Sequence, residues 1–271
     1  MSHLQGKKIA ILGGTGTLGK ALTKEISKTY PDVDKVLVFS RDEIKQLEMM
    51  DDFPSKDYPF LDYVLGDVRD VDRLSEVLSG LDIVIHAAAI KHVVMAEKNP
   101  RECWKTNVQG TKNVIEACLK NQVDTSIFIS TDKATNPYGV YGKSKLEAEE
   151  LWKSANKNSE LNFRTVRFGN IEDARGSVFE VFEKQKKTGT IKVTHPEATR
   201  YFISQKRAVK VILEMTSKDA PLLFTPEMKI FRILDLARKI APDCKIEFIG
   251  LRPGDKLHEE LDNNNTLELV R

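Results

Sequence analysis

The chain has 271 residues, with 42 Lys and Arg against 40 Asp and Glu, which gives a formal net charge of +2. A chain of this length can bury roughly three quarters of its unfolded surface, enough for one large core and a small second lobe. The balanced charge excludes a general electrostatic field for nucleic acid or an anionic membrane, so any anion must be bound locally. Three widely spaced cysteines and the lack of a signal peptide or a long apolar run predict a cytoplasmic protein without a disulfide, a metal site or a membrane span.

The first predicted element is a strand at residues 8–12, KIAIL, followed by a glycine-rich turn and a helix. Gly13 permits the tight turn, Gly16 lets a pyrophosphate approach the backbone, and Gly19 lets helix and strand pack closely. The amino terminus of the helix offers unpaired N–H groups and a positive dipole end to the phosphates. Because strand, turn and helix occur together, we predict a dinucleotide site formed by Gly13, Thr15, Gly16, Thr17, Leu18 and Gly19.

A second strand at residues 35–39 leads into Ser40, Arg41 and Asp42, where an acidic residue would hold the adenosine ribose of NAD. Arg41 can instead pair with a 2′-phosphate, with Ser40 donating a hydrogen bond and Lys45 adding charge one turn later. The pattern therefore favours NADP. Asp42 keeps NAD possible, and the structural alternative is that Arg41 and Asp42 form an ordinary exposed pair.

Two further strands are predicted at residues 60–65 and 81–85. The residues after the first strand would border the adenine, and the small residues after the second would let a planar cofactor lie against the backbone. For the small residues, close strand packing is the other interpretation. The candidate cofactor contacts are Asp67, Val68, Ala87, Ala88 and Ala89.

Lys91 lies at the edge of the expected cleft and is a candidate contact to both cofactor and substrate, although a surface or capping role fits equally well. The apolar spacing from about residue 100 to 120 predicts a long helix. Asn107 is a polar residue in the middle of this helix. We place it among the cofactor contacts, with satisfaction of buried backbone or a water as the alternative.

The most informative stretch is ISTDKATNPYGVYGKSK at 129–145. An apolar strand would end at Thr131, which places Asp132 and Lys133 at the carboxyl end of a parallel sheet, where α/β proteins bind ligands. Tyr141 and Lys145 are four residues apart on the following helix and share one face, and we place both among the cofactor contacts as well. An ammonium beside a phenol favours the phenolate, which could take a proton from a sugar hydroxyl. Each residue alone has a structural interpretation, such as a turn cap or an exposed side chain.

Alternating strands and helices predict an α/β fold with a doubly wound parallel sheet of the Rossmann type. The alternation fades after Asn170. We therefore expect an NADP-binding domain at 1–170 and a small C-terminal substrate-binding lobe at 171–271, parts of which can return to the sheet. The lobe is predicted to mix short helices with turns at 177–187, 199–204, 207–215, 233–241 and 251–261.

Three basic residues of the lobe, Arg200, Arg252 and Lys256, are candidates for a second phosphate site, because a nucleotide-sugar substrate needs its own cations. Arg252 also begins an Arg-Pro-Gly sequence, which is a plain turn signal.

Together these segments resemble the extended short-chain dehydrogenase/reductases, over nearly the whole chain. Within them the chain is similar to the nucleotide-sugar dehydratase and epimerase branch typified by 5-inverting UDP-N-acetylglucosamine 4,6-dehydratases. The resemblance rests on GGTGTLG at 13–19, GDVRD at 66–70, HAAAIKHV at 86–93, TNVQGT at 106–111, STDKA at 130–134, YGKSK at 141–145, RFGN at 167–170 and LRPGDKLHEEL at 251–261. The Thr-Asp-Lys triplet discriminates most, since related hexose dehydratases carry Glu in place of Lys133.

The resemblance implies a reaction on a UDP-sugar with no net redox change. Tyr141, assisted by Lys145 and Thr131, would remove the C4 hydroxyl proton as NADP takes the C4 hydride. Lys133, with a pKa lowered by burial and neighbouring cations, would abstract the C5 proton while Asp132 protonates the departing C6 hydroxyl. Hydride would return to C6 and C5 would be inverted. By the same resemblance, the nucleotide-sugar site would be lined by Asn170, Arg200, Arg252 and Glu259.

Two other functions fit the same sequence. An NADP-dependent nucleotide-sugar epimerase would use Tyr141, Lys145 and Thr131 without eliminating water. A nonenzymatic NADP-binding regulator is the alternative from another class, although such proteins often lose the reactive Tyr and Lys.

The resemblance also implies a homo-oligomer, in which helices at 100–120 and 141–157 pair across a two-fold axis. The alternative is that the apolar faces of these helices are buried within one chain. The chain is shorter than these relatives near residues 154–162 and after Thr199, which leaves base, sugar and stereochemistry open.

Overall fold

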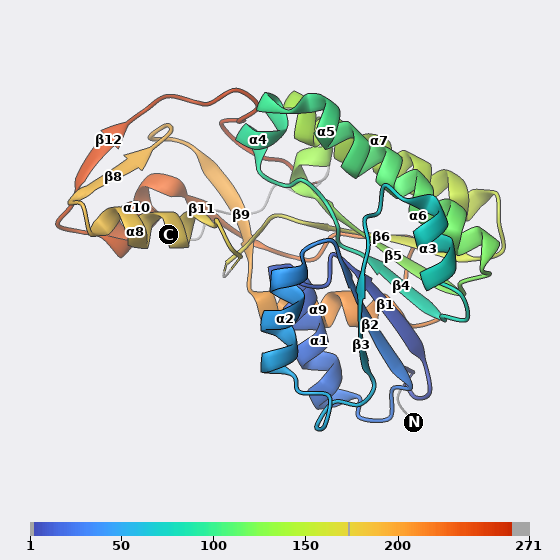
Figure 1. The fold of residues 1–271 in the computed structure, drawn as a ribbon. Coiled ribbons are helices and arrows are strands. Elements are labelled where there is room, and N and C mark those ends of the chain that lie inside the picture. Colours follow the sequence, from blue (N-terminus) through green and yellow to red (C-terminus); the bar gives the residue numbers. More distant parts are fainter. Residues whose placement is uncertain (1–2, 173, 262–271) are drawn as a thin grey trace.

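The largest layer of the computed structural model, which describes residues 3–172 and 174–261, is a seven-stranded sheet whose paired strands are all parallel (Figure 1). In spatial order its strands are β10 (Leu223–Phe224), β6 (Asn162–Phe168), β5 (Thr125–Thr131), β4 (Ile83–His86), β1 (Lys8–Leu12), β2 (Lys35–Ser40) and β3 (Leu61–Leu65). The central strands are apolar and almost fully buried, as expected for a parallel sheet covered on both faces. The order reverses between β1 and β4, which is where such sheets open a ligand-binding crevice.

Helices cover both faces of this sheet, so the predicted doubly wound Rossmann fold is confirmed (Figure 1). One core includes apolar residues of α1 (Thr17–Thr29), α2 (Glu43–Asp52) and α9 (Gln205–Glu214). The opposite core includes residues of α3 (Val71–Val77), α6 (Gly110–Lys120) and α7 (Gly139–Lys157). Both α9 and β10 come from beyond residue 170 and belong to the sheet layer, because α9 packs on α1 and β10 pairs with β6.

The predicted long helix at 100–120 is present but interrupted. It consists of α5 (Pro100–Trp104), the π-helical turn η1 (Lys105–Gln109) and α6, and it follows the short helix α4 (Val93–Lys98). A π turn widens a helix locally and is frequent at functional sites. Here the turn carries Asn107, the buried polar residue that the sequence places in the middle of the helix.

A smaller lobe stands over the carboxyl edge of the sheet (Figure 1). It contains a three-stranded sheet of β11 (Lys229–Arg232), β9 (Thr199–Ile203) and β7 (Asn170–Ile171), and a two-stranded sheet of β12 (Lys245–Phe248) and β8 (Thr190–Val193). The helices α8 (Val178–Lys186) and α10 (Ile233–Ile240) share an apolar core with these strands.

Two segments of the lobe differ from the expected helices and turns. Residues 199–203 form strand β9, because their aromatic and β-branched side chains suit the antiparallel pairing with β11. Residues 251–261 form turns and one isolated bridge between Thr199 and His258, with no helix in that stretch. The Pro-Gly pair at 253 and 254 fits this outcome, since both residues favour turns.

Replacement of Trp152 by alanine should destabilise the fold by about 3–5 kcal/mol, the usual cost of removing a fully buried Trp. The indole is stacked on Phe128 with centroids 5.4 Å apart, and the ring of Phe163 meets it edge-on at 5.2 Å. Urea unfolding measures the loss. The matched control is Trp104→Ala, because Trp104 is 44% exposed and its removal should change stability by about 0.5 kcal/mol or less. Equal losses in the two variants would contradict this placement of the core.

Candidate active site

A cleft of about 2040 Å³ runs along the carboxyl ends of the parallel strands and continues under the lobe. Its walls come from the segments that follow β1, β2, β4, β5 and β6, together with residues of the lobe. Apart from Asn107, each predicted cofactor residue lines it: Gly13, Thr15, Gly16, Thr17, Leu18, Gly19, Ser40, Arg41, Lys45, Asp67, Val68, Ala87, Ala88, Ala89, Lys91, Tyr141 and Lys145.

The glycine-rich turn has the geometry of a phosphate cradle. Gly13 has φ +82°, and a Cβ added there would lie 2.8 Å from the backbone N of Ala88. A Cβ at Gly19 would lie 2.3 Å from the carbonyl oxygen of Gly14, so both positions require glycine. The N-cap of α1, Gly16, makes no side-chain capping hydrogen bond, and the first turn has no acidic residue. These N–H groups therefore suit an anionic ligand such as a pyrophosphate.

The polar groups after β2 divide into paired and exposed side chains. The hydroxyls of Thr15 and Ser40 lie 2.8 Å apart, which fixes the end of the strand. Asp42 caps α2 and also binds the ammonium of Lys45, and this hydrogen bond lowers the pKa of Asp42. Arg41 has a side chain that is 59% exposed and lies 3.6 Å from the Asp67 carboxylate. Arg41 is thus better placed than Lys45 to meet a further anion.

Asn107 does not line the cleft, so its position gives no support to the cofactor contact predicted for it. Its amide instead forms a pair of hydrogen bonds with the backbone of Ile90, accepting from N at 2.8 Å and donating to O at 3.0 Å. It also donates to the hydroxyl of Ser144 at 3.0 Å. The alternative interpretation, satisfaction of buried backbone, is therefore confirmed. Asn107 joins the loop after β4 to the helix that carries Tyr141.

The five predicted catalytic residues come together at the carboxyl end of β5. Thr131 ends that strand, Asp132 and Lys133 belong to the short 3₁₀ helix η2 (Asp132–Ala134), and Tyr141 and Lys145 lie on the first turns of α7. Thr131 donates to Asp132 at 2.9 Å, and the Lys133 ammonium donates to the same carboxylate oxygen at 3.0 Å. Asp132 is fully buried behind the cleft wall, whereas the other four residues line the cleft.

Tyr141 and Lys145 do not show the electrostatic coupling predicted for them. Burial raises the pKa of Tyr141 to about 12, and the influences that oppose this rise are the ammonium of Lys133 and a hydrogen bond with Thr131. Lys145 donates to the carbonyl of Ile129 at 2.6 Å, and burial lowers the pKa of Lys145 to about 7. A lysine with a pKa of about 7 is only about half protonated at pH 7, and the cation that lowers the pKa of the Tyr141 phenol is Lys133.

The pKa of Lys133 also differs from the prediction. Burial alone lowers this pKa, but the carboxylates of Asp132 and Glu259 outweigh burial and raise the pKa above its ordinary value. The expectation of a lowered pKa considered burial and cations and did not include a second carboxylate. In this structure Lys133 is an ammonium.

The predicted substrate residues have different surroundings. Asn170 lines the cleft and donates to the carbonyl of Tyr201 at 3.1 Å. Arg252 also lines it, with a half-exposed guanidinium bound to the buried carboxylate of Asp255 at 2.8 Å. Glu259 does not line the cleft, so the direct substrate contact predicted for it is not supported by its position.

The other two basic candidates of the lobe are engaged with backbone. Lys256 donates to the carbonyl of Thr135 at 2.8 Å and lies outside the cleft lining, so its role as a phosphate contact is not supported. Arg200 lines the cleft, but its guanidinium donates to three backbone carbonyls of the lobe.

Sequence reasoning missed a loop that crosses the cofactor end of the cleft. The backbone N of Arg175 donates to the Thr17 hydroxyl at 3.1 Å, and the carbonyl of Arg175 accepts from Lys91 at 3.1 Å. Arg175 and His92 both line the cleft. Arg175 belongs to no local pattern that points to a ligand, because its loop meets the glycine-rich turn only in three dimensions.

Within residues 3–172 and 174–261, no cluster of His, Cys, Asp and Glu is arranged to hold a metal ion. In the same part of the chain, none of the helices combines the length and the apolar composition that crossing a membrane requires.

Comparison with known proteins matches residues 9–269 to the family described as polysaccharide biosynthesis protein. The chain belongs to this family. It is 42% identical over 270 residues to the inverting UDP-N-acetylglucosamine 4,6-dehydratase of Campylobacter jejuni, covering 97% of this chain and 80% of that one. It is 35% identical over 266 residues to a UDP-glucose 4-epimerase of Rickettsia canadensis, covering 94% and 77%.

Among solved structures, Pen from Bacillus thuringiensis matches this member of the polysaccharide biosynthesis family with a TM-score of 0.90 at 36% identity, covering 95% of this chain and 84% of that one. The predicted family resemblance is therefore confirmed along nearly the whole chain.

Proposed function

We propose that this chain is a nucleotide-sugar 4,6-dehydratase that acts on UDP-N-acetylglucosamine, uses NADP and inverts C5. The main support for this proposal is the buried Asp132–Lys133 pair, which lies beside Tyr141 at a cleft that also contains a phosphate cradle. The activity named for the Campylobacter relative supports the same substrate and reaction.

A dinucleotide fits the glycine-rich turn and the segments after β2 and β4, and when bound it would accept hydride from C4 and return it at C6. Tyr141 would take the proton of the C4 hydroxyl, and the hydrogen bond with Thr131 together with the charge of Lys133 would favour the phenolate. The C4 ketone formed in this way makes the C5 proton acidic.

The Asp132–Lys133 pair has the proton that elimination requires. Transfer of one proton along the 3.0 Å hydrogen bond converts ammonium and carboxylate into amine and carboxylic acid. The amine can then remove the C5 proton, and the acid can protonate the departing C6 hydroxyl. The total number of protons in the pair is unchanged, so the fully buried Asp132 needs no proton from solvent.

The epimerase alternative is favoured by the Rickettsia relative, which is named as a UDP-glucose 4-epimerase. An epimerase would need Tyr141 and Thr131 but would have no use for an acid and base beside C5 and C6. A nonenzymatic NADP-binding regulator is the weaker candidate, because the side chains of Thr131, Lys133 and Tyr141 line the cleft together.

Incubation of the protein with UDP-N-acetylglucosamine in deuterated water distinguishes these functions. A dehydratase yields a product that lacks one water and carries deuterium at C5. A product with the mass of the substrate apart from deuterium would identify an epimerase, and an unchanged substrate in the presence of tightly bound NADPH would favour the regulator.

The preference for NADP is tested by Arg41→Ala. Because Arg41 is the exposed guanidinium after β2, its loss should weaken NADPH binding roughly tenfold while NADH binding stays the same. Fluorescence titration with the two reduced dinucleotides measures the change, and Arg73→Ala, at a partly exposed arginine bound to Glu76, is the control. Equal effects on both dinucleotides would show that Arg41 does not recognise the 2′-phosphate and would remove this support for NADP.

A further inference from the structure

The segment 255–261 of the lobe returns to the loop that carries the catalytic triplet. Lys256 donates to the carbonyl of Thr135, and the hydroxyl of Thr135 donates to the carbonyl of Leu261, each at 2.8 Å. Glu260 accepts from the side chain of Asn136. These contacts hold residues 132–136 and 255–261 side by side, although they are far apart in the sequence.

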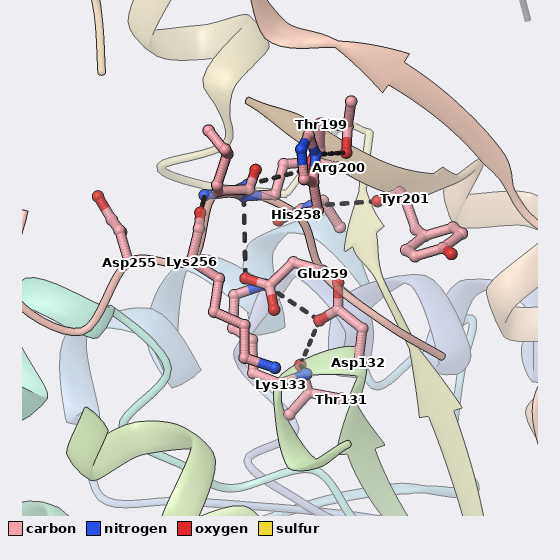
Figure 2. A network of polar contacts seen from close by, with 12 residues as sticks. Thr131, Asp132, Lys133, Thr199, Arg200, Tyr201, Asp255, Lys256, His258 and Glu259 are labelled. Atoms are coloured by element: carbon pink, nitrogen blue, oxygen red, sulfur yellow. Dashed lines mark hydrogen bonds and ion pairs between the residues drawn. The ribbon is translucent and has the colours of Figure 1, made fainter. Parts of the chain in front are cut away.

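Glu259 is the residue of this segment that faces the reaction centre. Figure 2 shows its carboxylate between Lys133 and Arg200, with Asp132 on the other side of the lysine. One oxygen lies 3.3 Å from the Lys133 ammonium nitrogen and 3.9 Å from Nε of Arg200. The side chain is 2% exposed, and its second oxygen is buried without a hydrogen-bond partner among the described residues. A carboxylate this deeply buried persists only if nearby cations balance it.

Arg200 keeps this carboxylate in place. Its guanidinium donates to the carbonyls of Thr199 at 2.7 Å, Leu257 at 3.1 Å and Lys256 at 2.8 Å. Because the two terminal nitrogens of Arg200 bind these backbone carbonyls, its Nε is the nitrogen that faces Glu259. The arginine thus fixes the segment, and the ammonium of Lys133 is the cation that touches both acidic side chains.

We propose that Glu259 is a positioning residue which, together with Asp132, holds Lys133 as an ammonium and so sets the pH range in which the Asp132–Lys133 pair keeps the proton that elimination requires. The part of this inference that concerns elimination rests on the proposed dehydratase function. The part that concerns the charge of Lys133 does not, because it can be measured without substrate. Glu259 would act through Lys133 and would not touch the sugar.

The charged and titratable groups around Lys133 come from each element packed against it. Asp132 lies on η2, Tyr141 on α7, Arg200 on β9 and Glu259 on the returning segment. Burial and Arg200 lower the pKa of Lys133, whereas the two carboxylates raise it and prevail. Loss of one carboxylate should therefore release the proton at a lower pH.

The test is Glu259→Gln, which keeps the shape of the side chain and removes its charge. The pH dependence of acetylation of Lys133 by acetic anhydride, followed by peptide mass spectrometry, reports the ionisation of its amine in the substrate-free protein. The midpoint for Lys133 should fall by about 1–3 pH units in this variant. Glu259→Asp, which keeps the charge, should restore most of the wild-type midpoint. Glu260→Gln, a change in the neighbouring carboxylate bound to Asn136, should leave the midpoint unchanged.

An unchanged Lys133 midpoint in Glu259→Gln would overturn the proposal, whether or not the protein turns over a sugar. If the wild type is a dehydratase, the alkaline limb of its pH–rate profile, on which the Asp132–Lys133 pair loses the proton that elimination requires, should shift to lower pH by the same amount. A lower kcat at every pH with no shift of that limb would show a purely structural role and would also overturn the proposal. Lack of turnover in the wild type would reject the proposed function. The acetylation result would still test whether Glu259 holds Lys133 as an ammonium.

Discussion

The Tyr141→Phe variant should lose sugar oxidation almost completely, with kcat reduced by about 10² to 10⁴-fold, the usual contribution of a positioned acid or base. The ring packs against Ala96 and Cys103 in a small apolar cluster, and phenylalanine keeps that packing. Only the hydroxyl is lost, and with it the group that takes the proton of the C4 hydroxyl. The measurement is the single-turnover appearance of reduced dinucleotide absorbance after the sugar is added.

The control for this variant is Tyr138→Phe, because Tyr138 is 61% exposed and lies just before α7. Its kcat should equal that of the wild type. All three proteins should still bind NADPH, since the phosphate cradle is untouched. A Tyr141→Phe variant that oxidises the sugar at more than about a tenth of the wild-type rate would exclude Tyr141 as the base.

The Lys133→Ala variant is expected to separate the two halves of the reaction. Elimination and deuterium exchange at C5 should fall by about 10² to 10⁴-fold, while oxidation at C4 stays measurable. C4 oxidation should itself be slower, because the ammonium of Lys133 lowers the pKa of the Tyr141 phenol. Product analysis by NMR in deuterated water and dinucleotide absorbance follow the two steps in one sample.

This substitution also removes the cation between two buried carboxylates, so we expect a loss of stability of about 3–5 kcal/mol. Lys143→Ala is the matched control, because Lys143 is exposed on α7, the helix that follows η2. Urea unfolding must show that the Lys133→Ala protein is folded at the assay temperature. Normal elimination by that folded variant would place the acid and base elsewhere.

The fold was largely predictable because its information is local. The apolar strands, the glycine-rich turn and the helical spacing after Tyr141 each depend on neighbouring residues, and each forms the expected element. The same holds for the Thr-Asp-Lys triplet, whose position at the end of β5 follows from the length of an apolar run. Features that depend on contacts between distant residues were harder to predict from the sequence. Examples are the π turn at Asn107 and the return of α9 and β10 to the sheet.

The charge states within the site could not be predicted from spacing. Lys145 is four residues from Tyr141, but its ammonium nitrogen is turned to the carbonyl of Ile129 and lies 3.9 Å from the centre of the Phe128 ring. The pKa of Lys133 depends on Glu259, which is distant in the sequence and close in the folded protein. A pKa reflects burial and nearby charges, and long-range packing determines both.

The most direct test of the central claim uses UDP-N-acetylglucosamine deuterated at C4, incubated with the protein and unlabelled NADP in ordinary water. If one cleft oxidises C4, eliminates water and restores the hydride, the product should carry the deuterium at C6, and the dinucleotide should remain unlabelled after complete turnover. Deuterium that stays at C4 of an isomerised sugar, or that accumulates in the dinucleotide, would contradict the account.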